Sequence, residues 1–169
     1  MIEPAYVRTM ARYNAWQNGQ LSRALLSLPH KALVEDRGAF FGSILATANH
    51  LLWGDTIWMS RFDPSVPAPE LPGTESVGLH PTAGAWSADR FRMDGKITAW
   101  ANRIKAVDLR GDLTWYSGVL GRQMTVPVTE AIVHMFNHQT HHRGQMHAML
   151  THAGAVAPVT DLFIMPKDA

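Results

Sequence analysis

The sequence contains no cysteine, and this absence excludes three kinds of chemistry. The chain can form neither a disulfide nor a thiolate metal site, and it has no cysteine nucleophile of its own. Any thiolate that takes part in a reaction must therefore come from a small cosubstrate.

The sequence also lacks an excess of charge of either sign. It has 15 basic and 14 acidic residues, which gives a net charge of +1. No cluster of Lys and Arg is dense enough to indicate nucleic-acid binding, and no basic amphipathic stretch indicates a membrane surface. We expect neither kind of partner.

A long uninterrupted apolar run is missing as well. The most apolar stretch, residues 39–59, is broken by Asn49, His50 and Asp55, so we do not expect it to span a membrane. The beginning of the sequence lacks the basic and then apolar pattern of a secretion signal. We therefore expect a cytoplasmic protein.

The patterns that are present predict one helical domain, which spans residues 1–169. Apolar residues make up 46% of the chain, enough to bury a core. Helices are predicted at 4–27, 40–62, 87–107 and 128–152. Loops are predicted at 30–38 and 63–85, and a β-hairpin at 112–127. The last helix is expected to end at Gly154, and the tail at 159–166 to pack back on the helices. This order predicts an all-α protein, a four-helix bundle with non-minimal topology, a long loop after helix 2 and a small hairpin before helix 4.

Histidine is abundant, and its spacing indicates a metal site. Six of the nine histidines fall between His134 and His152. Three of them, His134, His138 and His142, stand four residues apart, so each step turns only about 40° around a helix. Two imidazoles at this spacing can bind one metal ion from a single helix, and a third ligand must come from elsewhere in the fold.

His50 is the best third ligand, because His30 and His80 fall in predicted loops. It lies on an apolar helix stripe with two very small residues, which leaves room beside the ring; the stripe is Ala46, His50, Trp53, Gly54 and Ile57. The alternatives are a hydrogen-bonded core histidine at His50 and a packed or solvated pair on the last helix. His134 can be a ligand, a donor that supports the ligands or a core residue, and we favour the supporting donor. His141, His147 and His152 are expected on outer faces.

At these residues the sequence resembles a known family. The string FNHQTHHRGQ, residues 136–145, resembles the signature of the DinB superfamily, and the resemblance extends to ATANHLLWGD around His50 and to ARYNAW near the start. It implies a DinB-type four-helix bundle, usually a homodimer, with one divalent metal ion, zinc or nickel. It also implies that the metal ligands are His50, His138 and His142.

The resemblance implies a reaction as well. Some members of the superfamily transfer low-molecular-weight thiols such as bacillithiol, mycothiol or glutathione onto electrophiles, or use them in isomerisation. Three imidazoles plus water make an open type of site, and a chain without cysteine fits a thiol cosubstrate. We therefore predict thiol transfer.

Two other functions remain open. One is a hydrolase that uses metal-bound hydroxide, which would also need a nearby carboxylate. Asp55 and Glu130 are the nearest acids, but Asp55 lies about 140° around the helix from His50, and we expect both to be solvated or capping acids. The other is a non-catalytic, metal-stabilised binding protein. No catalytic residue is assigned.

The remaining predictions concern the last helix and the dimer. We expect Gln145 to hydrogen-bond toward the site, Arg143 to point away into a salt bridge or an interface, and Gly144 to allow another backbone to approach. The aromatic content of the first and third helices exceeds what one small core needs. The candidates for a dimer surface are Trp16, Trp86 and Trp100, and the alternative is that all three belong to the core.

Overall fold

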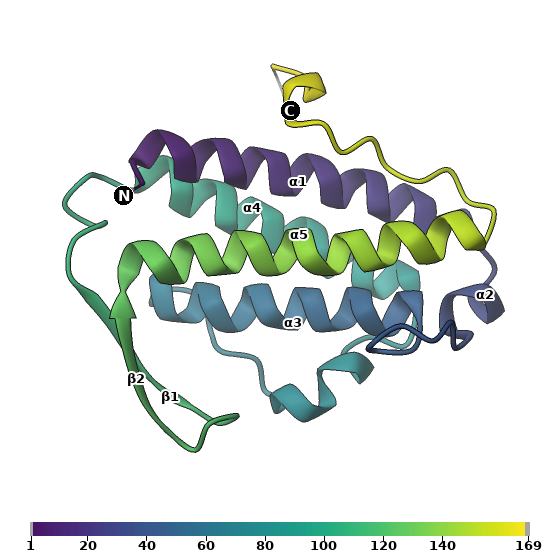
Figure 1. Ribbon diagram of the computed structural model, residues 1–169, viewed down its shortest axis with the longest axis horizontal. Helices are drawn as coiled ribbons and strands as arrows, with labels where there is room; N and C mark the ends of the chain where they lie inside the picture. Colours follow the sequence, from purple (N-terminus) through teal and green to yellow (C-terminus); the bar gives the residue numbers. More distant parts are fainter. Residues whose placement is uncertain (1, 168–169) are drawn as a thin grey trace.

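Four long helices lie side by side in the computed structural model of the protein, which describes residues 2–167 (Figure 1). They are α1 (Pro4–Leu26), α3 (Ile44–Phe62), α4 (Ala83–Arg103) and α5 (Val128–His152). α1 packs against α4, α3 packs against α5, and α3 also contacts α4. The predicted helical fold is therefore confirmed.

Polar caps decide where two of these helices begin. The Ser43 hydroxyl accepts a hydrogen bond from the backbone N–H of Ala46, so α3 begins at Ile44 and not at residue 40. Thr82 caps α4 in the same way, and α4 begins four residues before the predicted start at Ser87. A side-chain oxygen at this position satisfies a donor of the first turn that has no partner within the helix.

Two further local predictions have different outcomes. The predicted loop at 30–38 is wrong for its first five residues, which form the short helix α2 (His30–Val34). The predicted stop at Gly154 is confirmed: its φ is +74°, and the N–H of Ala155 donates to the carbonyl of Leu150. This geometry ends a helix in a Schellman motif, which favours glycine.

The long loop after α3 is fastened to that helix. It contains the 3₁₀ helix η1 (Gly73–Gly78), which packs on α3. The Asn49 amide donates to the carbonyl of Val77 at 2.8 Å, and the Trp53 indole N–H donates to the carbonyl of Leu71 at 2.8 Å. These bonds place η1 beside the middle of α3.

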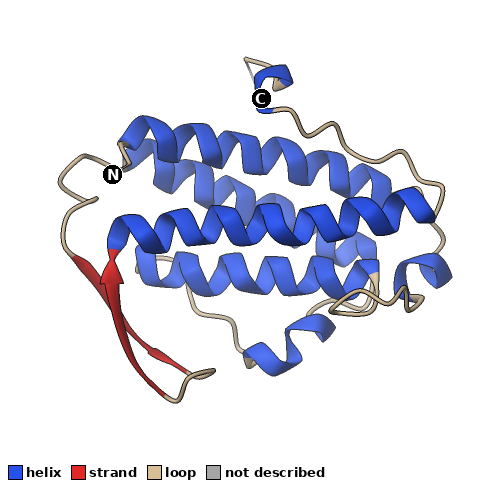
Figure 2. Cartoon of the chain, in the orientation of Figure 1, coloured by secondary structure: helices blue, strands red, loops and turns tan. Residues whose placement is uncertain are grey.

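The predicted hairpin is confirmed, and it leads directly into α5. β1 (Asp112–Ser117) and β2 (Arg122–Pro127) pair antiparallel, with Trp115 opposite Met124. Figure 2 shows the two strands leaving the beginning of α5 and running down past the end of α3. The Trp115 ring lies 5.3 Å from the Trp58 ring of α3, so the hairpin contacts the bundle.

The tail returns to the bundle, as predicted, but through polar contacts. The Tyr13 hydroxyl donates to the carbonyl of Thr160, and the Gln17 amide donates to the carbonyl of Val159, both at 2.6 Å. The tail also contains the 3₁₀ helix η2 (Leu162–Ile164). Phe163 is 87% exposed, so the apolar side chains of the tail contribute little to the core.

The core contains two of the three tryptophans predicted for a dimer surface. Trp86 and Trp100 are buried, and the Trp86 indole N–H donates to the carbonyl of Ala48. The prediction is wrong for these two residues, because a buried indole offers no surface to a partner; Trp16 is partly exposed. No helix within residues 2–167 is long and apolar enough to cross a membrane.

Candidate metal centre

Three histidines from two helices meet between α3 and α5. Each of His50, His138 and His142 offers one ring nitrogen, and these nitrogens all lie within 4.8 Å of one another. Nε2 of His50 and Nε2 of His138 are 3.2 Å apart. Two nitrogens bound to one tetrahedral zinc at 2.0–2.1 Å would lie about 3.4 Å apart, so this spacing suits a shared ion.

Gly54 provides the space for this meeting. It lies one turn after His50 on α3, and a Cβ at this position would lie 3.0 Å from Cε1 and 3.4 Å from Nδ1 of His138. Contacts of 3.0–3.4 Å are tighter than nine in ten real Cβ contacts, so the imidazole would have to give way. The small residues beside His50 therefore leave room for another ring, as predicted, and the ring that occupies this room is that of His138 on α5.

Two neighbouring side chains fix the orientation of the rings. Nδ1 of His50 lies 3.0 Å from the hydroxyl of Ser76, and Nδ1 of His142 lies 2.7 Å from Oε1 of Gln145. When Nδ1 is engaged in this way, Nε2 is left for a metal ion, and such outer contacts strengthen binding. The prediction for Gln145 is confirmed. Ser76 was missed, because it lies in the loop and no sequence periodicity links it to His50.

Burial keeps these imidazoles neutral. It lowers the pKa of His50 to about 4, with a further contribution from the neighbouring His142. Burial also lowers the pKa of His138 to about 3, and nearby histidines add to the effect. A neutral imidazole has the free lone pair that a metal ion requires. The three rings are thus ready to bind a cation at neutral pH.

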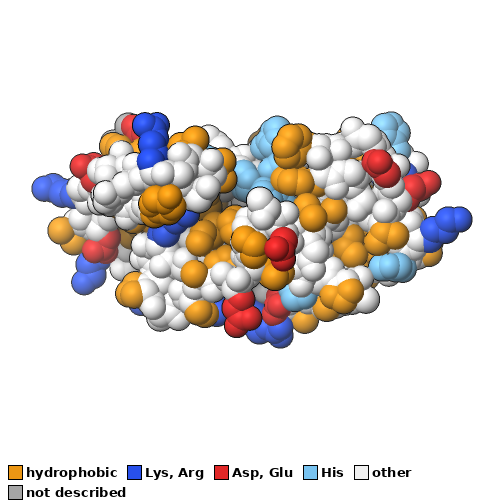
Figure 3. Space-filling view, turned by 90° about the horizontal axis from the view of Figure 1, so that it is seen from below, with side chains coloured by type: hydrophobic (Ala, Val, Ile, Leu, Met, Phe, Trp, Pro, Cys, Tyr) orange, Lys and Arg blue, Asp and Glu red, His pale blue; other side chains and the backbone are white. Residues whose placement is uncertain are grey.

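The surroundings of the cluster are aromatic and apolar. The Phe41 ring lies 4.1 Å from the His50 ring and 5.3 Å from the His142 ring, so it covers one side. Figure 3 shows histidine side chains in a hollow of this face, with hydrophobic side chains beside them. His50 and His138 are partly exposed, whereas His142 is buried.

The other histidines stay outside the cluster. The His134 ring lies 5.8 Å from the His138 ring and is not part of the cluster, so its supporting role stays a prediction. His141 is exposed as predicted, although its ring packs 4.7 Å from that of His142. His80 pairs with Asp89 at 2.7 Å.

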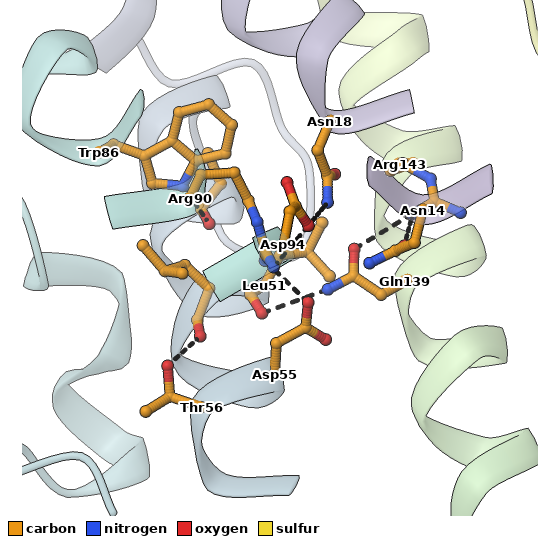
Figure 4. A network of polar contacts seen from close by, with 12 residues as sticks. Asn14, Asn18, Leu51, Asp55, Thr56, Trp86, Arg90, Asp94, Gln139 and Arg143 are labelled. Atoms are coloured by element: carbon orange, nitrogen blue, oxygen red, sulfur yellow. Dashed lines mark hydrogen bonds and ion pairs between the residues drawn. The ribbon is translucent and has the colours of Figure 1, made fainter. Parts of the chain in front are cut away.

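No carboxylate joins the three histidines in the part of the chain that the structure describes. Asp55 is 1% exposed and forms an ion pair with Arg90 at 2.7 Å, and Arg90 also pairs with Asp94 at 2.8 Å (Figure 4). The expectation of a solvated or capping Asp55 was wrong. Glu130 is exposed and precedes His138 by eight residues, about 12 Å along a helix.

Arg143 points away from the histidine cluster, as predicted, but it is buried in the polar interior and forms no salt bridge within the described residues. It is 7% exposed, and its guanidinium donates to Asn14 of α1 and to Gln139 (Figure 4). Within residues 2–167 no carboxylate forms an ion pair with it. It therefore joins α1 to α5. No atom lies within 4 Å of the point that a Cβ would occupy at Gly144, so the predicted close backbone approach is absent there.

Comparisons with known proteins agree with this fold. Protein DinB of Bacillus subtilis (strain 168) is 26% identical over 152 residues, which cover 88% of this chain and 87% of that protein. The crystal structure of a DinB-like protein from Bacillus cereus ATCC 10987 is similar with a TM-score of 0.63. It is 18% identical and covers 85% of this chain and 90% of that chain, so it supports the fold alone. A sequence profile described as the DinB family matches residues 1–168. Because this match spans almost the whole chain, the protein belongs to the DinB family.

Proposed function

We propose that this protein is a metal-dependent enzyme that transfers a low-molecular-weight thiol onto an electrophilic small molecule. The observation that carries the proposal is the cluster of His50, His138 and His142, whose ring nitrogens lie within 4.8 Å of one another. The absence of cysteine supports it, because the thiol must then be a second substrate.

The three histidines would hold one divalent ion, zinc or nickel. Imidazole nitrogens suit both metals, and three protein ligands leave a position for a substrate. When bound, such an ion lowers the pKa of a thiol and favours its thiolate form.

The chain's own residues orient the ligands and shape the space around them. Ser76 and Gln145 fix two of the imidazoles, and Phe41 keeps water from one side. In the reaction, the thiolate sulfur forms a bond to the electrophilic carbon. The bond from that carbon to the leaving group breaks, and its electron pair goes with the leaving group. The thiol proton passes to water.

A metal-dependent hydrolase is the second candidate, and a non-catalytic binding protein is the third. A hydrolase needs a carboxylate that can accept a proton beside the cluster. Asp55 is engaged by Arg90, and Glu130 lies too far along α5. This arrangement favours thiol transfer over hydrolysis.

The experiment compares metal-loaded wild type with His142→Ala, after elemental analysis of protein purified without a histidine tag. The matched control is His152→Ala, an exposed histidine at the end of the same helix. Each protein is assayed with several thiols and electrophiles, and with esters in the absence of thiol. We expect thiol-dependent turnover in wild type and the control, and neither metal nor turnover in His142→Ala.

Other results would change the assignment. Ester cleavage without any thiol would support the hydrolase. Full metal occupancy without turnover across the panel would support a binding role.

A further inference from the structure

A pocket of about 280 Å³ lies between α3, the hairpin and α5, one helical turn from the histidine cluster. We call it the aromatic pocket; it is lined by Trp58, Trp115, Val126, Glu130, Ala131 and His134. We propose that this pocket binds an uncharged aromatic group of the electrophilic substrate. The inference rests on the proposed function, since it names the substrate class of that reaction.

The walls of the aromatic pocket are rings from three different elements. The Trp58 and Trp115 rings are 5.3 Å apart with 72° between their planes, and the Trp58 and His134 rings are 5.1 Å apart at 62°. Rings at these angles present both faces and edges, the two arrangements in which aromatic groups attract one another. An aromatic guest can therefore pack on a face or an edge of these rings.

Arg61 holds the two indoles in place from outside the pocket. Its guanidinium carbon lies 4.5 Å from the centre of the Trp58 ring and 5.0 Å from that of Trp115. A cation over an indole face is attracted by the electrons of the ring. Because Arg61 contacts both rings, the walls are formed before a ligand arrives.

The pocket lies beside the metal centre, on the far side of His134. Along α5 the His142 and His138 rings are 4.5 Å apart, and the His138 and His134 rings are 5.8 Å apart. His134 then contacts Trp58, so an unbroken row of rings joins the cluster to the pocket. A substrate whose aromatic group lies in the pocket can thus reach the cluster through a linker that passes the His134 ring. This position gives His134 a role as a pocket wall.

The size and charge of the pocket define the guest. An apolar cavity of about 150 Å³ holds benzene, so about 280 Å³ suits one ring or two fused rings. The acidic residue of the lining, Glu130, is exposed and disfavours an anionic guest, and the guanidinium of Arg61 against both indoles disfavours a cationic one. The substrate class is thus an uncharged arene joined by a linker to a carbon that bears a leaving group.

The test uses three substitutions at two neighbouring residues of β1. Trp115→Leu removes a wall, whereas Tyr116→Leu changes a side chain on the opposite face that is 69% exposed. Trp115→Phe keeps an aromatic wall and should retain binding. Calorimetry measures the affinity for naphthol and for cyclohexanol, with and without zinc, and elemental analysis measures zinc content.

We expect wild type to bind naphthol more tightly than cyclohexanol. Trp115→Leu should weaken naphthol binding about tenfold, while Tyr116→Leu and Trp115→Phe stay close to wild type. Zinc content should be the same in all four proteins. In turnover, Trp115→Leu should raise KM for 4-phenylbutyl iodide, in which a linker joins the arene to the reacting carbon, and leave the rate with iodoacetamide, a small aliphatic electrophile, unchanged.

The failures of the two proposals are distinguishable. The pocket proposal would be wrong if wild type bound naphthol and cyclohexanol equally well. It would also be wrong if a folded Trp115→Leu protein bound naphthol as tightly as wild type does. Both conclusions hold whether or not any electrophile is turned over. Naphthol binding as expected, without turnover of any electrophile, would overturn thiol transfer and leave the pocket standing.

Discussion

Replacing Gly54 with alanine should weaken metal binding without unfolding the protein. The new Cβ would lie 3.0 Å from Cε1 of His138, and the nearest atoms that must yield belong to that imidazole and not to a backbone. The ring has to move by a few tenths of an ångström away from α3. Since His50 lies on α3, this movement also carries Nε2 of His138 away from Nε2 of His50.

Two opposing effects determine how far Gly54→Ala changes the free energy of unfolding. Alanine is more favourable than glycine inside a helix by about 1 kcal/mol, which offsets the cost of displacing one side chain. The free energy of unfolding of the metal-free protein should therefore change by less than about 1 kcal/mol. Metal ligands tolerate displacements of only about 0.2 Å. We expect a loss of zinc affinity of about 10- to 100-fold, which is typical when the support of a ligand is disturbed.

A zinc competition titration measures the affinity, and urea unfolding of the metal-free protein measures the stability. Gly95→Ala in α4 is the matched control, because no atom lies within 4 Å of its Cβ position. It should gain about 1 kcal/mol of stability and bind zinc as wild type does. Wild-type zinc affinity in Gly54→Ala would refute the reasoning.

Three further predictions concern the ion pairs and the assembly. Asp55→Ala should lower the free energy of unfolding by about 3 kcal/mol, measured in urea, because it removes one partner of the buried Arg90; a change below about 1 kcal/mol would contradict this. Hydrogen bonds from Ser65 hold the pKa of Asp63 below its ordinary value of 3.8. The stability that this carboxylate contributes is therefore present above pH 3.8 and is lost as the pH falls through the lower pKa of Asp63 in the folded protein. Asp63→Asn should therefore reduce the loss of thermal stability in acid, and an unchanged acid profile would contradict the assignment. Light scattering at micromolar concentration should show twice the mass of one chain, while a Trp16→Ala variant should dissociate more readily; a monomer alone would exclude the dimer.

The sequence by itself determined the features that depend on local spacing. Four amphipathic segments predicted the bundle, because the helical repeat places every third or fourth residue on one face. The same repeat placed His138 and His142 together, since two residues four apart in one helix are always neighbours. The small-residue stripe around His50 also indicated a ring that points into the bundle. The start of α4 was missed because the cap at Thr82 was overlooked.

Only the tertiary structure decided which distant residues meet. Ser76 reaches His50 because the loop is fastened to α3, and Trp115 reaches Trp58 because the hairpin turns toward the bundle. The sequence predicted a solvated Asp55, whereas in the structure α4 places Arg90 against it. Neither the direction of a loop nor the partner of a buried charge is encoded in local periodicity. Both are decided by packing, which pairs a charge or a ring with whatever the neighbouring helix presents.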